Sequence, residues 1–145
     1  DIVGSALVEL DIELMAPMSA TDIVVFAYLE DVAPSGTVTY ISEGTIRAGH
    51  SIGGGTNTSR VGALESLPRS YLCADIRPLK VNQRTTIKLL LEPIAYRFPV
   101  GHRVRLAIAG ADADNFYTKS INKIVSLASL WRVYDAGTRV RLPVA

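Results

Sequence analysis

The sequence has one cysteine, two histidines and almost no net charge, and each shortage narrows the possible functions. Cys73 stands alone, so an internal disulfide is excluded, and we expect a small buried or half-buried apolar residue rather than a reactive thiol. With only His50 and His102 and no cysteine pair, the usual ligand set of a zinc site is missing. The sequence therefore predicts no metal and no other cofactor.

The charge and hydropathy patterns argue against two classes of partner. A net charge of +1 gives no basic surplus for nucleic acid. The apolar runs are much shorter than the roughly 20 residues that a membrane helix needs, and the first residues show no signal-peptide pattern. We expect neither a nucleic-acid nor a membrane partner. The sequence identifies no compartment, and a cytoplasmic location is slightly favoured.

The length and composition suit one globular domain with a single core. The chain has 145 residues, of which 48% are hydrophobic and 20% charged, and it shows no internal repeat. No domain boundary is visible, so residues 1–145 are predicted to form one domain. Because the chain begins with Asp1 rather than Met and enters a strand almost at once, we expect it to be an excised or processed piece.

A period of two in the apolar residues is clearest near the start of the chain, at residues 6–15. Apolar and acidic residues alternate there, with Val8, Leu10, Ile12 and Leu14 on one face and Glu9, Asp11 and Glu13 on the other. Such alternation is typical of a strand with one wet face. The carboxylates are interpreted as a solvated sheet face rather than a metal site, because they repel one another and no histidine is near them in sequence.

Residues 21–50 predict a β-hairpin around which the rest of the chain is organised. Two runs rich in β-branched and aromatic residues, at 22–30 and 37–41, flank the turn sequence 33–36. Pro34 presets φ for the second turn position, and Gly36 accepts a positive φ. Gly44 and Gly49 then interrupt the pattern, so we expect the second strand to break or bulge there.

Further strands are predicted downstream, and no helix is predicted with certainty. Strands are expected at 85–91, at 103–109 with Val104, Leu106 and Ile108 directed inward, and at 139–144, with a short edge strand within 71–79. Residues 124–134 fit either a strand or a short helix, and the Gly-rich stretch 49–57 with its continuation to 69 is expected to be loop. Short strands separated by turns favour an all-β antiparallel sandwich or barrel.

Residues 49–53 read Gly-His-Ser-Ile-Gly and fit the G-x-S-x-G pattern of a nucleophile elbow. In such an elbow a strand-to-helix turn on a parallel sheet exposes the serine. The glycines that follow are poor material for a helix, and nothing here predicts a parallel sheet. Ser51 is therefore interpreted as part of a flexible loop. A minimal hydrolase with Ser51 as nucleophile and His102 as base remains an alternative to test.

Several segments carry a family resemblance. Within the hairpin these are Thr21-Asp22, Asp31-Val32, Pro34, Gly36, Gly44 and Ile46-Arg47-Ala48; later they are residues 98–106 and 134–144. They resemble the C-terminal domain of the X-Pro dipeptidyl-peptidase and cocaine esterase family of serine hydrolases. In that family a non-catalytic β jelly roll follows the catalytic α/β-hydrolase domain. The resemblance implies an all-β antiparallel jelly-roll sandwich, similar to galactose-binding-like domains, onto which no catalytic residue can be carried.

The resemblance also implies a parent protein and partners. The parent would cleave an X-Pro dipeptide from a peptide N-terminus or hydrolyse a small acyl ester. The jelly roll would pack on the α/β-hydrolase catalytic domain, shape its cleft and support a homo-oligomer. The chain would then lack the first part of the jelly roll and the upstream catalytic domain, and alone it would be inactive.

Six residues of these motifs have predicted structural roles, and they are Asp22, Asp31, Arg47, Gly101, His102 and Arg103. We predict that Arg47 pairs with Asp22 or Asp31 and so holds the hairpin to the following loop. The turn that contains Gly101 leads into the strand that begins at Arg103. The ring nitrogens of His102 are expected to satisfy neighbouring backbone or carboxylate groups rather than to serve as a base or metal ligand.

A second class of function is a stand-alone carbohydrate-binding jelly roll. Stacked, exposed aromatic residues beside the long loops would favour it, whereas an apolar face with a polar rim would favour docking. The aromatic residues are spread through the predicted strands, where core or cross-strand packing is the commoner role.

Overall fold

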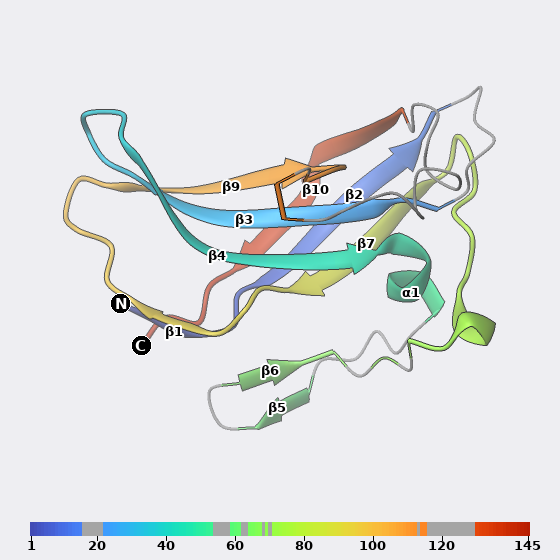
Figure 1. Cartoon of the computed structure of the whole chain (residues 1–145), viewed down its shortest axis with the longest axis horizontal. Coiled ribbons are helices and arrows are strands. Elements are labelled where there is room, and N and C mark those ends of the chain that lie inside the picture. The colour runs from blue at the N-terminus through green and yellow to red at the C-terminus, as the bar shows by residue number, and fades with distance from the viewer. Residues whose placement is uncertain are drawn as a thin grey trace.

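The chain forms a β-sandwich, and the computed structural model describes residues 1–15, 22–53, 59–61, 64–67, 69, 71–112, 114–115 and 130–145. Helical structure in these residues is limited to α1 (Ala48–Gly53) and a 3₁₀ turn at Cys73–Asp75. The strands are β1 (Ile2–Gly4), β2 (Leu7–Leu14), β3 (Val24–Val32), β4 (Val38–Arg47), β5 (Ser59–Val61), β6 (Leu64–Ser66), β7 (Arg84–Leu90), β8 (Ile94–Tyr96), β9 (Arg103–Ala109) and β10 (Trp131–Arg141) (Figure 1).

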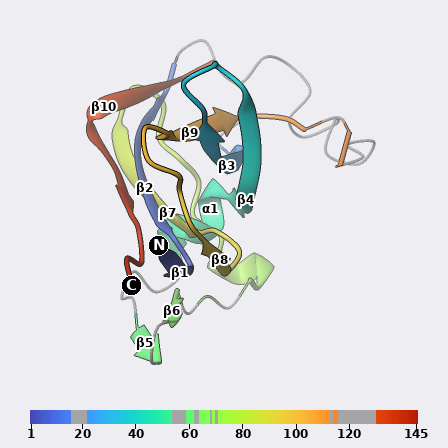
Figure 2. The ribbon, with the colours of Figure 1, turned by 90° about the vertical axis from the view of Figure 1, so that its left-hand side faces the viewer.

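Two antiparallel three-stranded sheets make up the sandwich. Their strand orders are β10-β2-β7 and β4-β3-β9, and Figure 2 shows them as two layers. The short pairs β1–β8 and β5–β6 are also antiparallel. The two chain ends lie side by side, and the Ala145 N–H donates to the Asp1 carbonyl at 3.2 Å. The predicted all-β antiparallel sandwich of the jelly-roll type is confirmed.

The core lies between the two sheets and follows the period of two. The inward residues of the two central strands are at most 1% exposed, and they are Val8, Leu10, Ile12 and Leu14 of β2 and Val25, Ala27 and Leu29 of β3. Burying one such large aliphatic side chain contributes about 1.5–3 kcal/mol to stability. The alternation at residues 6–15 therefore predicts the buried face correctly, because adjacent residues of a strand point to opposite faces.

Two turns bring the ends of β3, β4 and β9 together at one end of the sandwich. Gly36 has φ +89° and its N–H donates to the Ala33 carbonyl at 2.9 Å. Gly101 has φ +83°, and the His102 N–H donates to the Pro99 carbonyl at 3.1 Å. Both glycines occupy the left-handed region that the turn chemistry of the sequence predicts.

The prediction that the second hairpin strand breaks or bulges at Gly44 is wrong. β4 continues through Gly44 to Arg47, and the register shifts at Ile41 instead, between the pairs Leu29↔Ser42 and Glu30↔Tyr40. A Cβ at position 44 would lie 2.5 Å from the Leu90 carbonyl oxygen. The glycine is therefore required by the close approach of the backbone at the end of β7, a constraint that no local pattern shows.

The segment after β4 holds more regular structure than predicted. The short helix α1 begins the Gly-rich stretch, and the β5–β6 pair lies within the predicted loop to residue 69. A 3₁₀ turn stands where an edge strand was predicted at 71–79, and Cys73 in that turn is exposed rather than buried. Tertiary anchors such as the bond from the Ala48 N–H to the Ile23 carbonyl, at 2.8 Å, override the weak local propensity.

The last two long strands differ from prediction in their details. On β9, Leu106 and Ile108 pack against the core as predicted, but Val104, which pairs with Asp31 near the start of the strand, is 46% exposed. β10 is one strand with a register shift between Tyr134 and Arg139, where two strands were predicted. Residues 124–129 of the strand-or-helix segment lie outside the described residues. No helix of the described part is long and apolar enough to cross a membrane.

Candidate functional site

A buried carboxylate joins three elements at the end of the sandwich that carries the two turns. Asp31 lies near the end of β3 and is only 3% exposed. His102 Nδ1 is 2.8 Å from Asp31 Oδ1, and the Tyr96 hydroxyl donates to Asp31 Oδ2 at 2.8 Å. Because a carboxylate only accepts, Nδ1 must carry the proton of the first bond. Each oxygen has a donor, as a buried carboxylate requires. We call Asp31, Tyr96 and His102 the turn-end cluster.

The local sequence explains how the turn-end cluster forms. The left-handed conformation of Gly101 reverses the chain after Pro99 and places His102 directly before β9. Tyr96 ends β8, and its ring packs edge-on against Phe98 with centroids 4.9 Å apart. The hydrogen bond to Asp31 raises the pKa of Tyr96, and burial and the negative charge of Asp31 raise it further. The predicted contact between His102 and a neighbouring carboxylate is thus present.

An Asp–His pair of this kind orients the imidazole for proton transfer in serine hydrolases, but a triad also needs a hydroxyl at the other ring nitrogen. The candidate nucleophile Ser51 lies in α1. Figure 1 shows α1 at the end of the sandwich opposite the start of β9, which His102 immediately precedes. The structure therefore keeps Ser51 and His102 apart.

The Ser51 hydroxyl fastens α1 to β7. Ser51 is 4% exposed; its Oγ donates to the Lys88 carbonyl at 3.1 Å and accepts from the Lys88 N–H at 2.7 Å. The half-buried Arg69 guanidinium strengthens the same junction, donating to the Lys88 carbonyl at 2.6 Å and to the His50 carbonyl at 3.2 Å. Burial lowers the pKa of Arg69. A hydroxyl held in this way acts as a structural tie, although it matches a nucleophile pattern.

The prediction that Arg47 pairs with Asp22 or Asp31 is confirmed for Asp22. Arg47 Nε donates to Asp22 Oδ2, and the Gly49 N–H donates to Asp22 Oδ1 at 2.9 Å. The side chains of Arg47 and Asp22 are 42% and 14% exposed, respectively. We call Asp22, Arg47 and Gly49 the helix-end cluster, since they join the start of β3 to α1. Arg103, the sixth predicted residue, is exposed on β9 opposite Val32 and joins neither cluster.

A hydrogen-bonded group after β9 had no signal in the sequence. The Tyr28 hydroxyl donates to Asp112 Oδ2 at 2.6 Å, and Asn115 Nδ2 donates to the same oxygen at 3.0 Å. Burial, and then the bond to Asp112, raise the pKa of Tyr28, while the bond from Tyr28 lowers the pKa of Asp112. The partners are 84 residues apart, so only the pairing of β3 with β9 brings them together. Among the described residues no group of three acidic, histidine or cysteine side chains is arranged to hold a metal.

Comparison with known proteins assigns the chain to a family. Residues 2–142 match the family described as the X-Pro dipeptidyl-peptidase C-terminal non-catalytic domain. Two curated proteins, from Mycobacterium bovis and Mycobacterium tuberculosis and both named as candidate serine esterases, are each 36% identical over 138 residues. Each match covers 92% of this chain but 20% of the relative, so the chain spans about a fifth of the length of the relatives it matches. The chain therefore belongs to the family of X-Pro dipeptidyl-peptidase C-terminal non-catalytic domains.

Proposed function

We propose that this chain is the non-catalytic β-sandwich domain of a serine hydrolase and packs on the α/β-hydrolase catalytic domain of the same parent protein. The family match over residues 2–142 is the observation that carries the proposal. The burial of Ser51 and its two bonds to Lys88 agree with it, because they leave the chain's one nucleophile motif without an accessible hydroxyl. The packed domain shapes the active-site cleft of the parent and supports its oligomer.

The two curated relatives favour an acyl ester over an X-Pro peptide as the parent substrate. Both are named as candidate serine esterases, whereas the family description refers to a dipeptidyl-peptidase. We also propose that the sandwich has the galactose-binding-like arrangement that the family resemblance implies.

The carbohydrate-binding alternative has less support. Tyr40 on β4 and Tyr71 after β6 are 57% and 63% exposed, so both rings are accessible. The Tyr71 ring, however, lies 5.5 Å from the His50 ring at the α1 end. A sugar platform needs aromatic faces that a single pyranose can cover. Tyr40 lies on β4 and Tyr71 lies between β6 and the 3₁₀ turn, so the two rings come from different parts of the chain.

Hydrolysis by the purified chain tests its non-catalytic nature. We expect no turnover of a p-nitrophenyl ester or a Gly-Pro chromogenic amide. Ser51→Ala should also show no turnover. It should unfold at a lower urea concentration, because the Lys88 N–H loses a buried acceptor at a cost of about 1–3 kcal/mol. Turnover by the wild-type chain that Ser51→Ala abolishes, with unfolding unchanged, would overturn the proposal.

The parent protein tests the packing role. Deletion of the segment that corresponds to residues 1–145 should lower both kcat/KM for ester hydrolysis and the thermal unfolding temperature, because the catalytic domain would lose a packed neighbour. A deletion variant with unchanged kcat/KM and unchanged unfolding temperature would show that the domain does not support the catalytic portion.

A further inference from the structure

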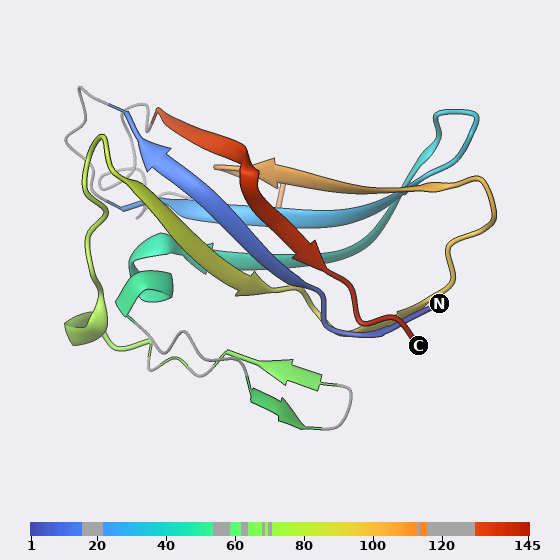
Figure 3. The same cartoon turned by 180° about the vertical axis from the view of Figure 1, so that it is seen from behind.

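A cavity of about 90 Å³ lies where an end strand of one sheet meets an end strand of the other. These strands, β4 and β7, lie on the same side of the sandwich, next to α1 (Figure 3). The cavity is lined in part by Thr45 of β4, Leu90 of β7 and, from the segment between β6 and the 3₁₀ turn, Leu67, Arg69 and Tyr71. Because one water needs about 10–15 Å³, the cavity has room for a ligand of about six non-hydrogen atoms.

Arg69 brings to this cavity a positive charge that no acidic side chain of the described residues neutralises. The half-buried guanidinium donates to two backbone carbonyls, of His50 at 3.2 Å and of Lys88 at 2.6 Å. These bonds fix the group and leave further N–H donors for a ligand. None of the ion pairs between described residues includes Arg69. Burial lowers the pKa of Arg69 and Tyr71 opposes this, so the charge is held against a desolvation cost that an anion would offset.

The backbone is strained where Tyr71 lines the cavity. Its φ of +54° lies in the left-handed region that residues other than glycine rarely adopt. The exposed Tyr71 ring lies 5.5 Å from the ring of His50, whose carbonyl accepts from Arg69. Strained residues of this kind cluster at ligand-binding sites, where the surrounding contacts hold them. The strain and the fixed guanidinium therefore mark the same place by independent observations.

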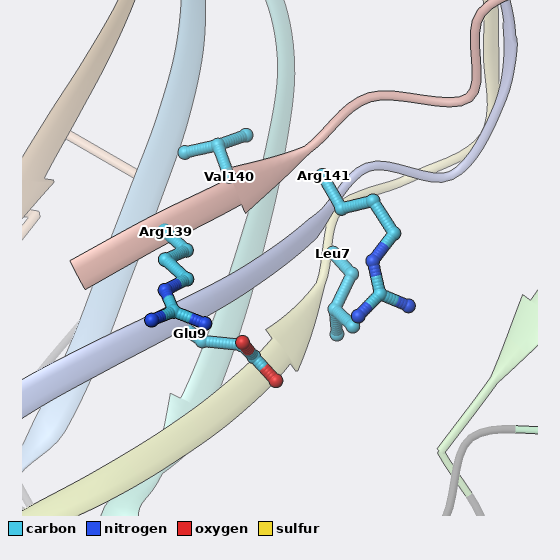
Figure 4. A pocket seen from close by; sticks show the side chains of 5 residues that line it. All are labelled: Leu7, Glu9, Arg139, Val140 and Arg141. Atoms are coloured by element: carbon cyan, nitrogen blue, oxygen red, sulfur yellow. The ribbon is translucent and has the colours of Figure 1, made fainter. Parts of the chain in front are cut away.

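A larger cavity, of about 300 Å³, lies beside β2 and β10 and offers a contrast. Figure 4 shows Glu9 beside Arg139 in that cavity, and the two residues pair across the β10–β2 ladder. Glu9 Oε1 also lies 2.7 Å from Lys88 Nζ, so Glu9 is more than part of a solvated face. There a carboxylate of the protein itself faces the cations, whereas at Arg69 no described side chain supplies one.

We propose that the cavity beside Arg69 binds a small carboxylate with a short aliphatic tail. The carboxylate accepts from the remaining guanidinium N–H groups, whose planar arrangement matches its two oxygens. The tail lies against Leu67 and Leu90, which are half-buried, as apolar walls with one fixed charge favour. Hydrolysis of a small acyl ester by water releases a carboxylate of this class and an alcohol. The parent would therefore supply the ligand, and this link alone rests on the proposed function.

Titration of the ¹⁵N-labelled chain with sodium butyrate, at constant ionic strength, tests the site. A dispersed amide spectrum first establishes that the chain is folded. We expect the Lys88 and Leu90 amides to shift with a Kd of about 1–10 mM, because so small a ligand makes few contacts. Butyramide, which has the same shape without the charge, should bind at least about tenfold more weakly. Equal shifts with butyrate, butyramide and sodium chloride would overturn the site.

Substitution of Arg69 should abolish the titration. Arg69→Gln is expected to weaken butyrate binding at least about tenfold, because the charged donor is lost. The matched control is Arg77→Gln, since Arg77 is exposed and donates only to the carbonyls of Ala74 and Ile76. Its affinity for butyrate should equal that of the wild type. A folded Arg69→Gln chain with wild-type affinity would contradict the proposal.

A second variant leaves the bonds of Arg69 to the backbone in place. Thr45 is exposed at the cavity, so Thr45→Asp should place a carboxylate within reach of Arg69 and lower the affinity for butyrate at least about tenfold by competition. Thr37→Asp, also exposed but absent from the cavity lining, is the control and should bind as the wild type does. Unchanged affinity in Thr45→Asp would overturn the site even if Arg69→Gln fails to fold.

The outcomes are distinguishable from those of the proposed function, because binding is measured in this chain alone. A folded chain that does not bind butyrate overturns the site, whereas the packing role is tested by kcat/KM of the parent. Binding by the chain, with a parent that hydrolyses no acyl ester, supports the site and excludes the ester product as its source. If butyrate binds the chain but not the intact parent, and Arg69 reacts with phenylglyoxal only in the chain, an acidic side chain of the parent is the occupant and the free ligand is refuted.

Discussion

Asp31 and Asp22 lie at opposite ends of β3, and each accepts hydrogen bonds from residues distant in sequence. Asp31 accepts from Tyr96 and His102, and Asp22 accepts from the single segment 47–49. In the turn-end cluster the Asp31 side chain is 3% exposed and binds His102 and Tyr96. In the helix-end cluster Asp22 is 14% exposed, and its partner Arg47 is 42% exposed. An aspartate carboxylate thus links neighbouring segments at each end of β3, but the two carboxylates differ in their exposure to solvent.

Burial, more than the presence of a charge pair, decides how much such a contact contributes to stability. A buried carboxylate that loses a partner, or is itself removed, leaves polar groups unsatisfied away from water. An exposed pair exchanges its partners for water and contributes only about 0–1 kcal/mol. Asp31 should therefore determine stability, while Asp22 and Arg47 should mainly orient the chain entering α1.

The largest expected difference comes from Asp31→Asn. The amide keeps the shape of the side chain, but it cannot accept from both His102 and Tyr96 as the carboxylate does. We expect a loss of about 3 kcal/mol in the free energy of unfolding and a lower melting temperature by about 10 °C. The matched variant Asp22→Asn should lose about 1 kcal/mol or less. Equal urea midpoints for the two variants would contradict the comparison.

An intermediate effect is expected from alkaline pH. The folded-state pKa of Tyr96 is raised above its unfolded value of about 10. The resulting stabilisation is complete below pH 10 and is lost as the pH rises through the folded-state pKa. The urea midpoint should therefore fall less between pH 9 and 11 in Tyr96→Phe than in the wild type. Tyr71→Phe, the same change at an exposed phenol, is the control, and a wild-type slope in Tyr96→Phe would refute the assignment.

The smallest effect is expected from Arg47→Ala. Asp22 keeps its bond from the Gly49 N–H and gains water in place of the guanidinium, so unfolding should change by about 0–1 kcal/mol. The difference from the wild type should shrink further at high salt. If Arg47→Ala lowers the free energy of unfolding by more than about 2 kcal/mol, the helix-end cluster contributes as much as a buried network and the comparison with Asp31 fails.

The sequence predicts the sandwich, the strand faces and the turns, because each depends on neighbours within a few residues. The alternation around Leu10 gives the buried face, and Gly36 and Gly101 give the turns. Of the candidate sites, the pair Arg47–Asp22 and the contact of His102 with a carboxylate could be predicted as types of interaction. The identity of the second carboxylate could not, because 71 residues separate Asp31 from His102.

The features that prediction missed all depend on contacts between distant segments. The local sequence around Gly44 predicts a strand break, but in the structure the Leu90 carbonyl lies close to this glycine. The local sequence around Ser51 predicts a loop, but in the structure the Lys88 N–H donates to its hydroxyl. Tyr96 has no sequence signal as a partner of Asp31, because 65 residues separate the two. Such contacts depend on how the strands pair and how the two sheets pack, which local propensity does not encode.

Local patterns and motifs in the sequence are sufficient to predict the all-β class, the period-two core and the family. The role of Ser51 as a structural tie and that of Asp31 as a buried junction follow only from the packed sheets. The physical reason is that hydrogen bonding, burial and net local charge depend on which strands become neighbours, and that is settled when the sheets pair and pack.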